Sequence, residues 1–225
     1  MKKQFTAALL TAVFVLTGVG AGCARPPYVG TGDGDLAAVE IREYEGKDLS
    51  SIREFPQNAY RGPQYVNVDD YALTVHGLVE NDLLYTYDEV IDGYKSYRKV
   101  VTLSCVEGWD VTILWEGILL ADLFGDAGVL PGANTVIFRS VDDYSTSLPL
   151  DYILDNDIML AFKMNEVTLP PERGFPFQLV AESKWGYKWI RWLDEIELSN
   201  DPSFKGYWEG YGYSNSGDLN KYFLD

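Results

Sequence analysis

The chain has 225 residues, 47% of them hydrophobic and 14% aromatic, so it is long enough to bury one substantial core. Its 18 basic and 34 acidic residues give a formal net charge of −16 at pH 7. Nucleic acid is therefore excluded as a partner, because phosphate binding needs a basic face. We find no repeat and no long internal linker, and the sequence predicts a single folded domain.

Residues 1–23 have the pattern of a signal peptide. Lys2 and Lys3 precede an apolar run over residues 5–19, and small residues lead up to Cys23. Small residues before a cysteine are also typical of a bacterial lipoprotein signal, in which Cys23 would carry the lipid. Ordinary signal peptidase cleavage nearby is the alternative. We expect an exported protein on the periplasmic or extracellular face, held to the membrane through a lipid anchor only.

Composition divides the rest of the chain into three parts. Residues 24–49 are rich in proline, glycine and charge, and predict a flexible tether. Residues 50–213 form the expected folded domain, and residues 214–225 a C-terminal tail. Removal of residues 1–22 takes away two lysines and no acid, which leaves 16 basic against 34 acidic residues, a net charge of −18. Such a surface favours solubility and attracts a basic redox partner.

The first elements of the domain read as a strand, a strand and a short helix. Residues 71–79 alternate as a half-buried strand, and a second strand follows at residues 83–85. Thr86 with Glu89 predicts a capping box at the start of a helix that ends near residue 93. The single histidine, His76, lies on the first strand, so we interpret it as a sheet residue. One histidine also makes a haem within this chain improbable.

Cys105 follows a buried strand expected over residues 100–103. If Cys23 carries lipid, Cys105 is the one thiol left, and no disulfide can form within the chain. Metal ligation explains an unpaired thiol at a strand end, and an inert buried cysteine is the alternative. We interpret Glu107 and Asp110, which flank the thiol, as structural. Trp109 belongs either to a pocket wall or to the core.

Further strands are expected over residues 111–115, 134–140 and 158–162, with a turn at residues 116–117. Short helices are expected over residues 119–124 and 151–154. This mixture of strands and short helices predicts an α+β fold with several mixed β-sheets.

Three motifs, in order, resemble one family. Residues 104–109 (Ser-Cys-Val-Glu-Gly-Trp) and 114–123 resemble the molybdenum-binding segment of the sulfite oxidase superfamily, in particular the branch of the periplasmic methionine sulfoxide reductase catalytic subunit. Residues 169–180 and 184–192 resemble its second and third signatures. The resemblance covers about residues 50–213 and implies a sulfite-oxidase-like molybdopterin-binding fold.

The resemblance also implies a set of site residues. Cys105 would give its thiolate to the molybdenum of a molybdenum-molybdopterin cofactor, a soft sulfur donor for a metal that favours one. Contacts to the cofactor are implied at Asn58, Arg61, Ser140, Arg173, Gln178, Lys188, Trp189, Ile190 and Arg191. For Asn58 a simple loop cap is the alternative, and for residues 184–192 an edge strand. Gln178 replaces an arginine of the family, and Trp189 replaces a serine or glycine.

The function implied is a molybdopterin-dependent oxidoreductase that moves an oxygen atom to or from a small neutral S- or N-oxide. Electrons would come from a separate partner, such as a membrane haem protein or a quinone-linked protein. We expect a monomer, because no dimerisation domain follows residue 213. The alternative is a cofactor-free surface lipoprotein that binds a ligand. It is suggested by Lys2-Lys3, because relatives that load cofactor in the cytoplasm carry a twin-arginine pair.

Overall fold

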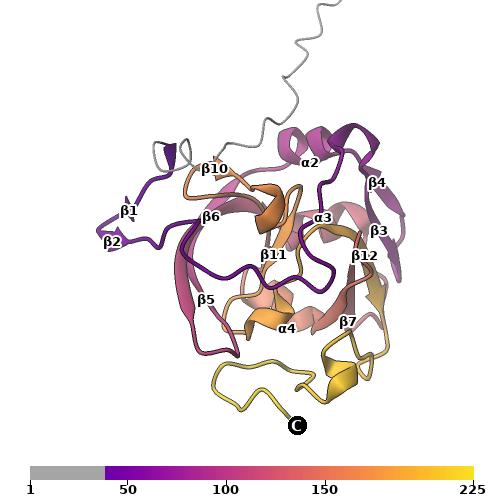
Figure 1. The fold of residues 1–225 in the computed structure, drawn as a ribbon. Coiled ribbons are helices and arrows are strands. Elements are labelled where there is room, and N and C mark those ends of the chain that lie inside the picture. Colours follow the sequence, from indigo (N-terminus) through magenta and orange to yellow (C-terminus); the bar gives the residue numbers. More distant parts are fainter. Residues whose placement is uncertain (1–38) are drawn as a thin grey trace, which may run out of the picture.

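The computed structural model describes residues 39–225, so the predicted signal peptide, Cys23 and most of the predicted tether lie outside the described residues. The core lies between two five-stranded sheets (Figure 1). One has the strand order β10-β9-β6-β5, with β11 also paired to β9, and the other has the order β4-β3-β12-β7-β8.

The first sheet is antiparallel and carries the thiol. It contains β5 (Tyr97–Ser104), β6 (Asp110–Leu119), β9 (Met159–Met164), β10 (Val167–Thr168) and β11 (Gln178–Val180). The turn expected at residues 116–117 was wrong, because β6 continues through a register shift between Glu116 and Gly117. A Cβ at Gly117 would lie 2.2 Å from the carbonyl oxygen of Leu160, so this close approach requires glycine.

The second sheet is mixed. It contains β3 (Leu73–Gly77), β4 (Leu83–Tyr85), β7 (Thr135–Ser140), β8 (Ser145–Pro149) and β12 (Leu193–Ser199). Strand β12 runs parallel to β3 and antiparallel to β7. The predicted α+β class is confirmed, with one mixed and one antiparallel sheet rather than several mixed ones.

Three short α-helices accompany the sheets in residues 39–225: α2 (Tyr87–Gly93), α3 (Leu120–Ala127) and α4 (Leu150–Asp155). The predicted capping box of α2 is confirmed, since Thr86 and Glu89 exchange side-chain to backbone hydrogen bonds. Helix α3 runs three residues further than expected and ends at Gly128, which adopts the left-handed conformation. No helix in this part of the chain is long and apolar enough to cross a membrane.

One hydrophobic cluster joins the two sheets and the helices. Trp115 of β6, Phe138 of β7 and Phe177 before β11 are among its largest fully buried side chains. Each buried side chain of this size stabilises the fold by roughly 1.5–3 kcal/mol. The cluster therefore holds the strand ends, and the loops that leave them, in fixed positions.

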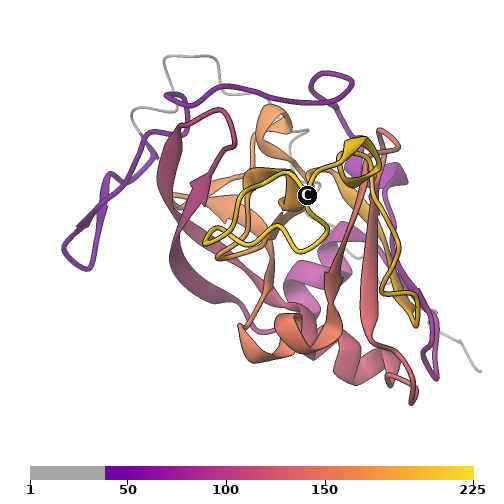
Figure 2. The same cartoon turned by 90° about the horizontal axis from the view of Figure 1, so that it is seen from below.

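Both predicted flexible ends contact the domain within the described residues. Near the N-terminal end, β1 (Glu43–Tyr44) and β2 (Lys47–Asp48) form a small hairpin. The buried carboxylate of Glu40 accepts hydrogen bonds from Ser51 Oγ at 2.6 Å and from the Ile52 amide at 2.9 Å. The C-terminal stretch lies across one end of the molecule (Figures 1 and 2), where the ammonium group of Lys184 bonds Asp218. Composition alone indicated a tether and a tail, because long-range contacts leave no local signal.

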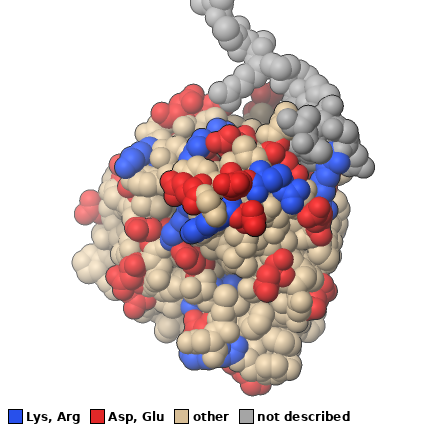
Figure 3. Space-filling view, turned by 90° about the vertical axis from the view of Figure 1, so that its left-hand side faces the viewer, with Lys and Arg blue, Asp and Glu red and all other residues tan. Residues whose placement is uncertain are grey.

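The face on the β5 side carries both signs of charge, interspersed rather than gathered (Figure 3). Glu116 of β6 takes ion pairs from Arg98 at 2.9 Å and from Lys163 at 2.8 Å, and Lys99 pairs with Glu182 at 2.5 Å. The basic side chains Arg98, Lys99 and Lys163 on this face are therefore each paired with an acid.

Candidate active site

Cys105 stands in a tight loop between β5 and β6. Its carbonyl accepts a hydrogen bond from the Gly108 amide at 3.0 Å, and its own amide donates to the Trp109 carbonyl at 2.9 Å. Gly108 has φ +86°, a conformation that glycine adopts without strain. The loop fixes the thiol at the edge of a cavity of about 550 Å³.

Four stretches far apart in the sequence form most of this cavity: residues 55–60, 103–109, 186–192 and 207–213. Asp142 and Tyr144 from the β7–β8 turn, Arg173, and Gln178 of β11 complete the wall. The site is therefore built by both sheets and by the loops between them.

Seven of the ten predicted site residues line the cavity: Asn58, Cys105, Arg173, Gln178, Trp189, Ile190 and Arg191. The other three, Arg61, Ser140 and Lys188, do not. Arg61 is exposed and pairs with Asp143. Ser140 is buried behind the wall, where its hydroxyl donates to Asp142 at 2.6 Å. Lys188 is fully buried, and its ammonium group faces Glu209.

Asn58 and Glu107 surround the thiol. The side-chain amide of Asn58 lies 4.0 Å from Cys105 Sγ and donates to the Glu107 carboxylate at 2.7 Å. Burial raises the pKa of the thiol, and a hydrogen bond from the Glu107 backbone opposes the shift. Hydrogen bonds from Asn58 and Trp109 lower the pKa of the Glu107 side chain, which stays ionised. Such a thiol stays protonated at neutral pH until an electrophile or metal displaces the proton.

Arg173 and Arg191 place two guanidinium groups at the cavity. Arg173 donates to the carbonyl of Phe55 at 2.9 Å and stacks over that ring at 3.8 Å. Arg191 donates to the carbonyls of Asn58 and Glu172. Burial lowers the pKa of each to about 10, so both remain charged at neutral pH. Within residues 39–225 neither forms an ion pair with a carboxylate, and the two charges suit an anion such as a phosphate.

The sequence did not predict the aromatic part of the wall. Tyr207, Trp208 and Tyr213 line the cavity, and the Tyr207 ring centroid lies 4.1 Å from that of Tyr60. Trp109, placed by the sequence in a wall or in the core, lines the cavity. Residues 206–213 are rich in aromatics, but no local pattern shows that they fold back over a thiol about 100 positions earlier in the chain.

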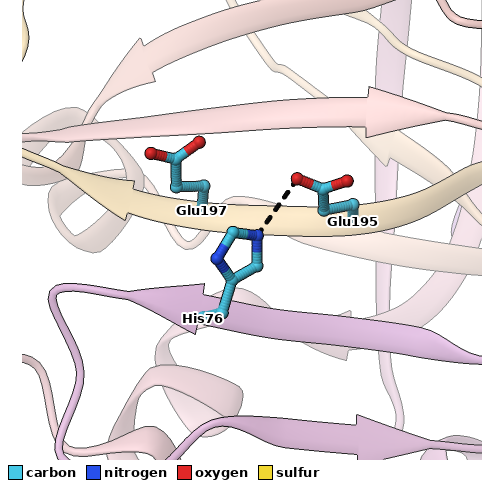
Figure 4. A group of neighbouring side chains, drawn as sticks. All are labelled: His76, Glu195 and Glu197. Carbon is cyan, nitrogen blue, oxygen red and sulfur yellow. Dashed lines mark hydrogen bonds and ion pairs between the residues drawn. The ribbon is translucent and has the colours of Figure 1, made fainter.

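A second group of potential metal ligands lies away from the cavity, on β3 and β12 (Figure 4). The ligand atoms of His76, Glu195 and Glu197 lie within 4.8 Å of one another. His76 Nε2 lies 3.0 Å from Glu195, which confirms its place in the sheet. Arg139 of β7 already donates to Glu195 at 2.6 Å and to Glu197 at 2.8 Å. The group is therefore part of a charge network across β3, β12 and β7, in which Arg139 is the cation that balances the two carboxylates.

An α+β domain thus brings a cysteine and two arginines, neither paired with a carboxylate among residues 39–225, to one cavity. Comparison with known families identifies the class of protein, because residues 60–208 match the family model described as "Oxidoreductase molybdopterin binding domain". The chain belongs to this family. It is a molybdenum-cofactor-dependent oxidoreductase, and the expected cofactor, molybdenum-molybdopterin, is that of the family.

Individual relatives agree with this assignment. The chain is 32% identical over 157 residues to an uncharacterized oxidoreductase, YuiH, of Bacillus subtilis, covering 69% of this chain and 78% of the relative. It is 34% identical over 166 residues to a putative protein-methionine-sulfoxide reductase subunit, YedZ1, of Azospira oryzae, covering 72% of this chain and 62% of the relative. The chain thus spans less than two thirds of the second protein.

The fold has a counterpart among solved structures. The sulfane dehydrogenase SoxCD of Paracoccus pantotrophus superposes with a TM-score of 0.62 at 18% identity, over 85% of this chain and 56% of that chain. At this identity the likeness concerns the fold alone. Together with the family match, it confirms the expected sulfite-oxidase-like molybdopterin-binding fold of β-sheets and short helices.

Proposed function

We propose that the cavity holds the molybdenum through the sulfur of Cys105 and that this site carries out oxygen-atom transfer. The proposal rests on one observation: Cys105, Arg173 and Arg191 line the same cavity, and neither arginine forms an ion pair with a carboxylate of the described residues. A thiolate is a suitable soft ligand for the metal. When bound, the cofactor supplies the two-electron redox chemistry, and the protein supplies binding and orientation.

The cavity offers matching partners for the organic part of the cofactor. Arg173 and Arg191 would hold its phosphate, because both guanidinium groups are charged and keep donors free for an anion. Asn58 and Gln178 present neutral amides to the same space. Lys188 is not part of this set, since its ammonium group is already bound to Glu209 and to the carbonyl of Ser147.

The substrate we propose is a small neutral S- or N-oxide. Arg173 and Arg191 supply the cationic side chains among the described residues that line the cavity, and the phosphate occupies both. No lining cation is then left for an anionic substrate. Reduction of a sulfoxide consumes two electrons and two protons and releases the thioether and one water. The Gln178 amide can donate to the substrate oxygen without adding charge.

We propose that the electrons come from a separate redox protein, such as a membrane haem protein or a quinone-linked protein. This chain has a single histidine, and His76 is engaged by Glu195. The net charge of −16 favours a partner with a basic docking face. The enzyme itself would act as a monomer.

Export and lipid attachment at Cys23 also remain proposals, because these residues lie outside the described part of the chain. A diacylglyceryl anchor binds membranes firmly, whereas a single acyl chain binds weakly. In the native host, Cys23→Ala should move the protein from the membrane fraction to the soluble fraction. Unchanged fractionation would argue against the anchor.

Metal analysis of the full chain, purified from a host that makes the cofactor, tests the proposal directly. Near-stoichiometric molybdenum together with reduction of a simple dialkyl sulfoxide by an artificial electron donor is the expected result. A purified, folded protein without molybdenum would favour the cofactor-free lipoprotein. Protein that contains molybdenum but turns over neither sulfoxides nor N-oxides would support the cofactor site and reject the proposed reaction.

A further inference from the structure

Behind the cavity wall lies an ion pair with no exposure to solvent. The Lys188 ammonium group contacts the Glu209 carboxylate at 2.5 Å, and the exposed fraction of each side chain is 0%. Lys188 ends the 3₁₀ helix η3 (Gly186–Lys188), and Glu209 begins the 3₁₀ helix η4 (Glu209–Tyr211). The pair therefore joins two segments that both continue into the cavity wall.

The pair is poorly explained as a source of stability. Burial lowers the pKa of Lys188, against the opposing effect of Glu209. The second carboxylate oxygen of Glu209 is buried and has no hydrogen-bond partner among the described residues. Buried ion pairs often contribute no more to stability than well-packed apolar residues of the same volume. What the pair does provide is a fixed distance between two segments.

The first of these segments, residues 184–191, carries Arg191, one of the two arginines that we propose hold the cofactor phosphate. Trp189, Ile190 and Arg191 line the cavity wall. The Trp189 side chain turns into the core, where its ring lies 5.8 Å from that of Trp115 and its indole N–H donates to the Lys184 carbonyl. This segment therefore contacts the core through Trp189 and lines the cavity with Arg191.

The second segment, residues 206–213, forms the aromatic wall. A Cβ at Gly206 would lie 2.2 Å from the Ser145 carbonyl oxygen, and the Tyr207 amide donates to that oxygen at 3.0 Å. Thr146 Oγ1 donates to Glu209 at 2.6 Å. Through these contacts, Glu209 holds the turn from which Tyr207 and Trp208 line the cavity.

We propose that Lys188 and Glu209 are positioning residues that couple cofactor binding to the order of the aromatic wall. Neither side chain lines the cavity, so both act through the segments they join. This role differs from the contact to the cofactor that the family resemblance implied for Lys188. The inference rests on the proposed function in one respect, that residues 207–213 face the substrate.

Hydrogen exchange of the full chain, with and without cofactor, tests the coupling independently of activity. Apoprotein is purified from a host that cannot make the cofactor. In the wild type, cofactor should increase protection of the amides of residues 207–213 by about tenfold or more. Lys188→Met and Glu209→Gln should lose this response. Lys184→Met is the matched control, because it breaks the other ion pair of the loop, to Asp218, and should keep the response.

Each single variant leaves one partner of the buried pair without the other, which can prevent folding. The double variant Lys188→Met/Glu209→Leu removes both charges and avoids this problem. It should fold and bind cofactor, yet lack the protection of residues 207–213. A response equal to the wild type in this variant, or the absence of a response in the wild type, overturns the coupling.

Steady-state kinetics of the double variant Lys188→Met/Glu209→Leu test whether residues 207–213 position the substrate. The variant should raise KM for a dialkyl sulfoxide about tenfold while kcat changes less than about threefold, the pattern of lost positioning. If exchange shows the coupling but no S- or N-oxide is turned over by the wild type, the proposed reaction fails and the positioning role stands. A fall in kcat with KM unchanged would contradict a role in placing the substrate wall.

Discussion

The side-chain amide of Asn58 lies 4.0 Å from the sulfur of Cys105, although 46 residues separate them along the chain. The same nitrogen donates to Glu107 at 2.7 Å, so one amide links the loop before β3 to two residues of the thiol loop, Cys105 and Glu107. Arg191 in turn donates to the backbone carbonyl of Asn58. The proposed metal ligand and the proposed phosphate ligand thus share a neighbour, which orients them toward the same cavity.

Cys105→Ser should abolish activity while leaving the fold intact. The side chain is only partly buried and serine has nearly the same shape, so the free energy of unfolding of the apoprotein should change by less than about 1 kcal/mol. Steady-state activity of the loaded enzyme and thermal unfolding of the apoprotein measure the two effects. Ser104→Ala, one residue earlier in β5, is the control and should keep its activity. Activity equal to the wild type in Cys105→Ser would reject the ligand assignment.

Removal of either cavity arginine should weaken cofactor retention. A charge-assisted hydrogen bond is worth about 1.5–3 kcal/mol, so Arg173→Met or Arg191→Met should lower the affinity for cofactor by roughly 10- to 100-fold. The molybdenum content after dialysis against a fixed buffer measures the loss. Arg61→Met provides the comparison, because Arg61 is exposed, pairs with Asp143 and lies outside the cavity wall. Equal losses in all three variants would mean that net charge, not the site, governs retention.

Asp194 of β12 makes the stability of the protein depend on pH. Burial, helped by the charge of Glu195, raises its pKa to about 6. Because the folded state binds this proton more tightly than the unfolded state, the group destabilises the fold progressively as pH rises through the window from about 4 to 6. Asp194→Asn removes the penalty and should stabilise the protein more at pH 7.5 than at pH 5. After allowance for the partial exposure of Asp194, the difference should be roughly 0.5–1 kcal/mol.

Thermal unfolding of wild type and variant at the two pH values checks this sign. Asp201→Asn is the opposite case, since hydrogen bonds from Ser203 lower the pKa of Asp201 and its charged form stabilises the fold. Compared with the wild type, that variant should become progressively less stable as pH rises through the range in which Asp201 ionises. An Asp194→Asn variant whose advantage shrinks between pH 5 and pH 7.5 would contradict the argument.

The sequence predicted what is local in this protein. Alternation over residues 71–79, the capping box of Thr86 and Glu89, and the strand before Cys105 all appear where expected, because adjacent residues determine them. Motif order was also enough to predict the fold class and seven lining residues. The α+β class and the cofactor are confirmed, whereas the role of each site residue stays a prediction.

What failed depended on distant partners. Residues 116–117 look like a turn, but the close approach of Leu160 makes them a bulge inside β6. The resemblance implied a cofactor contact at Lys188, but its ammonium group binds Glu209, 21 positions later in the chain, and the side chain does not line the cavity. Motifs place a residue in a segment, and only the packed structure shows which way its side chain points.

The last prediction concerns the charge of the substrate. If Arg173 and Arg191 hold the phosphate, as we propose, the cavity has no spare cation for an anion such as sulfite, because Gln178 is neutral. The net negative charge of the chain also repels such an anion. A neutral sulfoxide or N-oxide loses nothing, because the amide can donate to its oxygen. We expect steady-state reduction of neutral sulfoxides and N-oxides to exceed sulfite oxidation by about 100-fold or more in kcat/KM, the scale of one missing charge-assisted contact. Artificial electron donors and acceptors allow both directions to be measured on one preparation. Efficient sulfite turnover that collapses in Arg173→Ala, with molybdenum content unchanged, would show that Arg173 binds substrate rather than phosphate and would reverse this assignment.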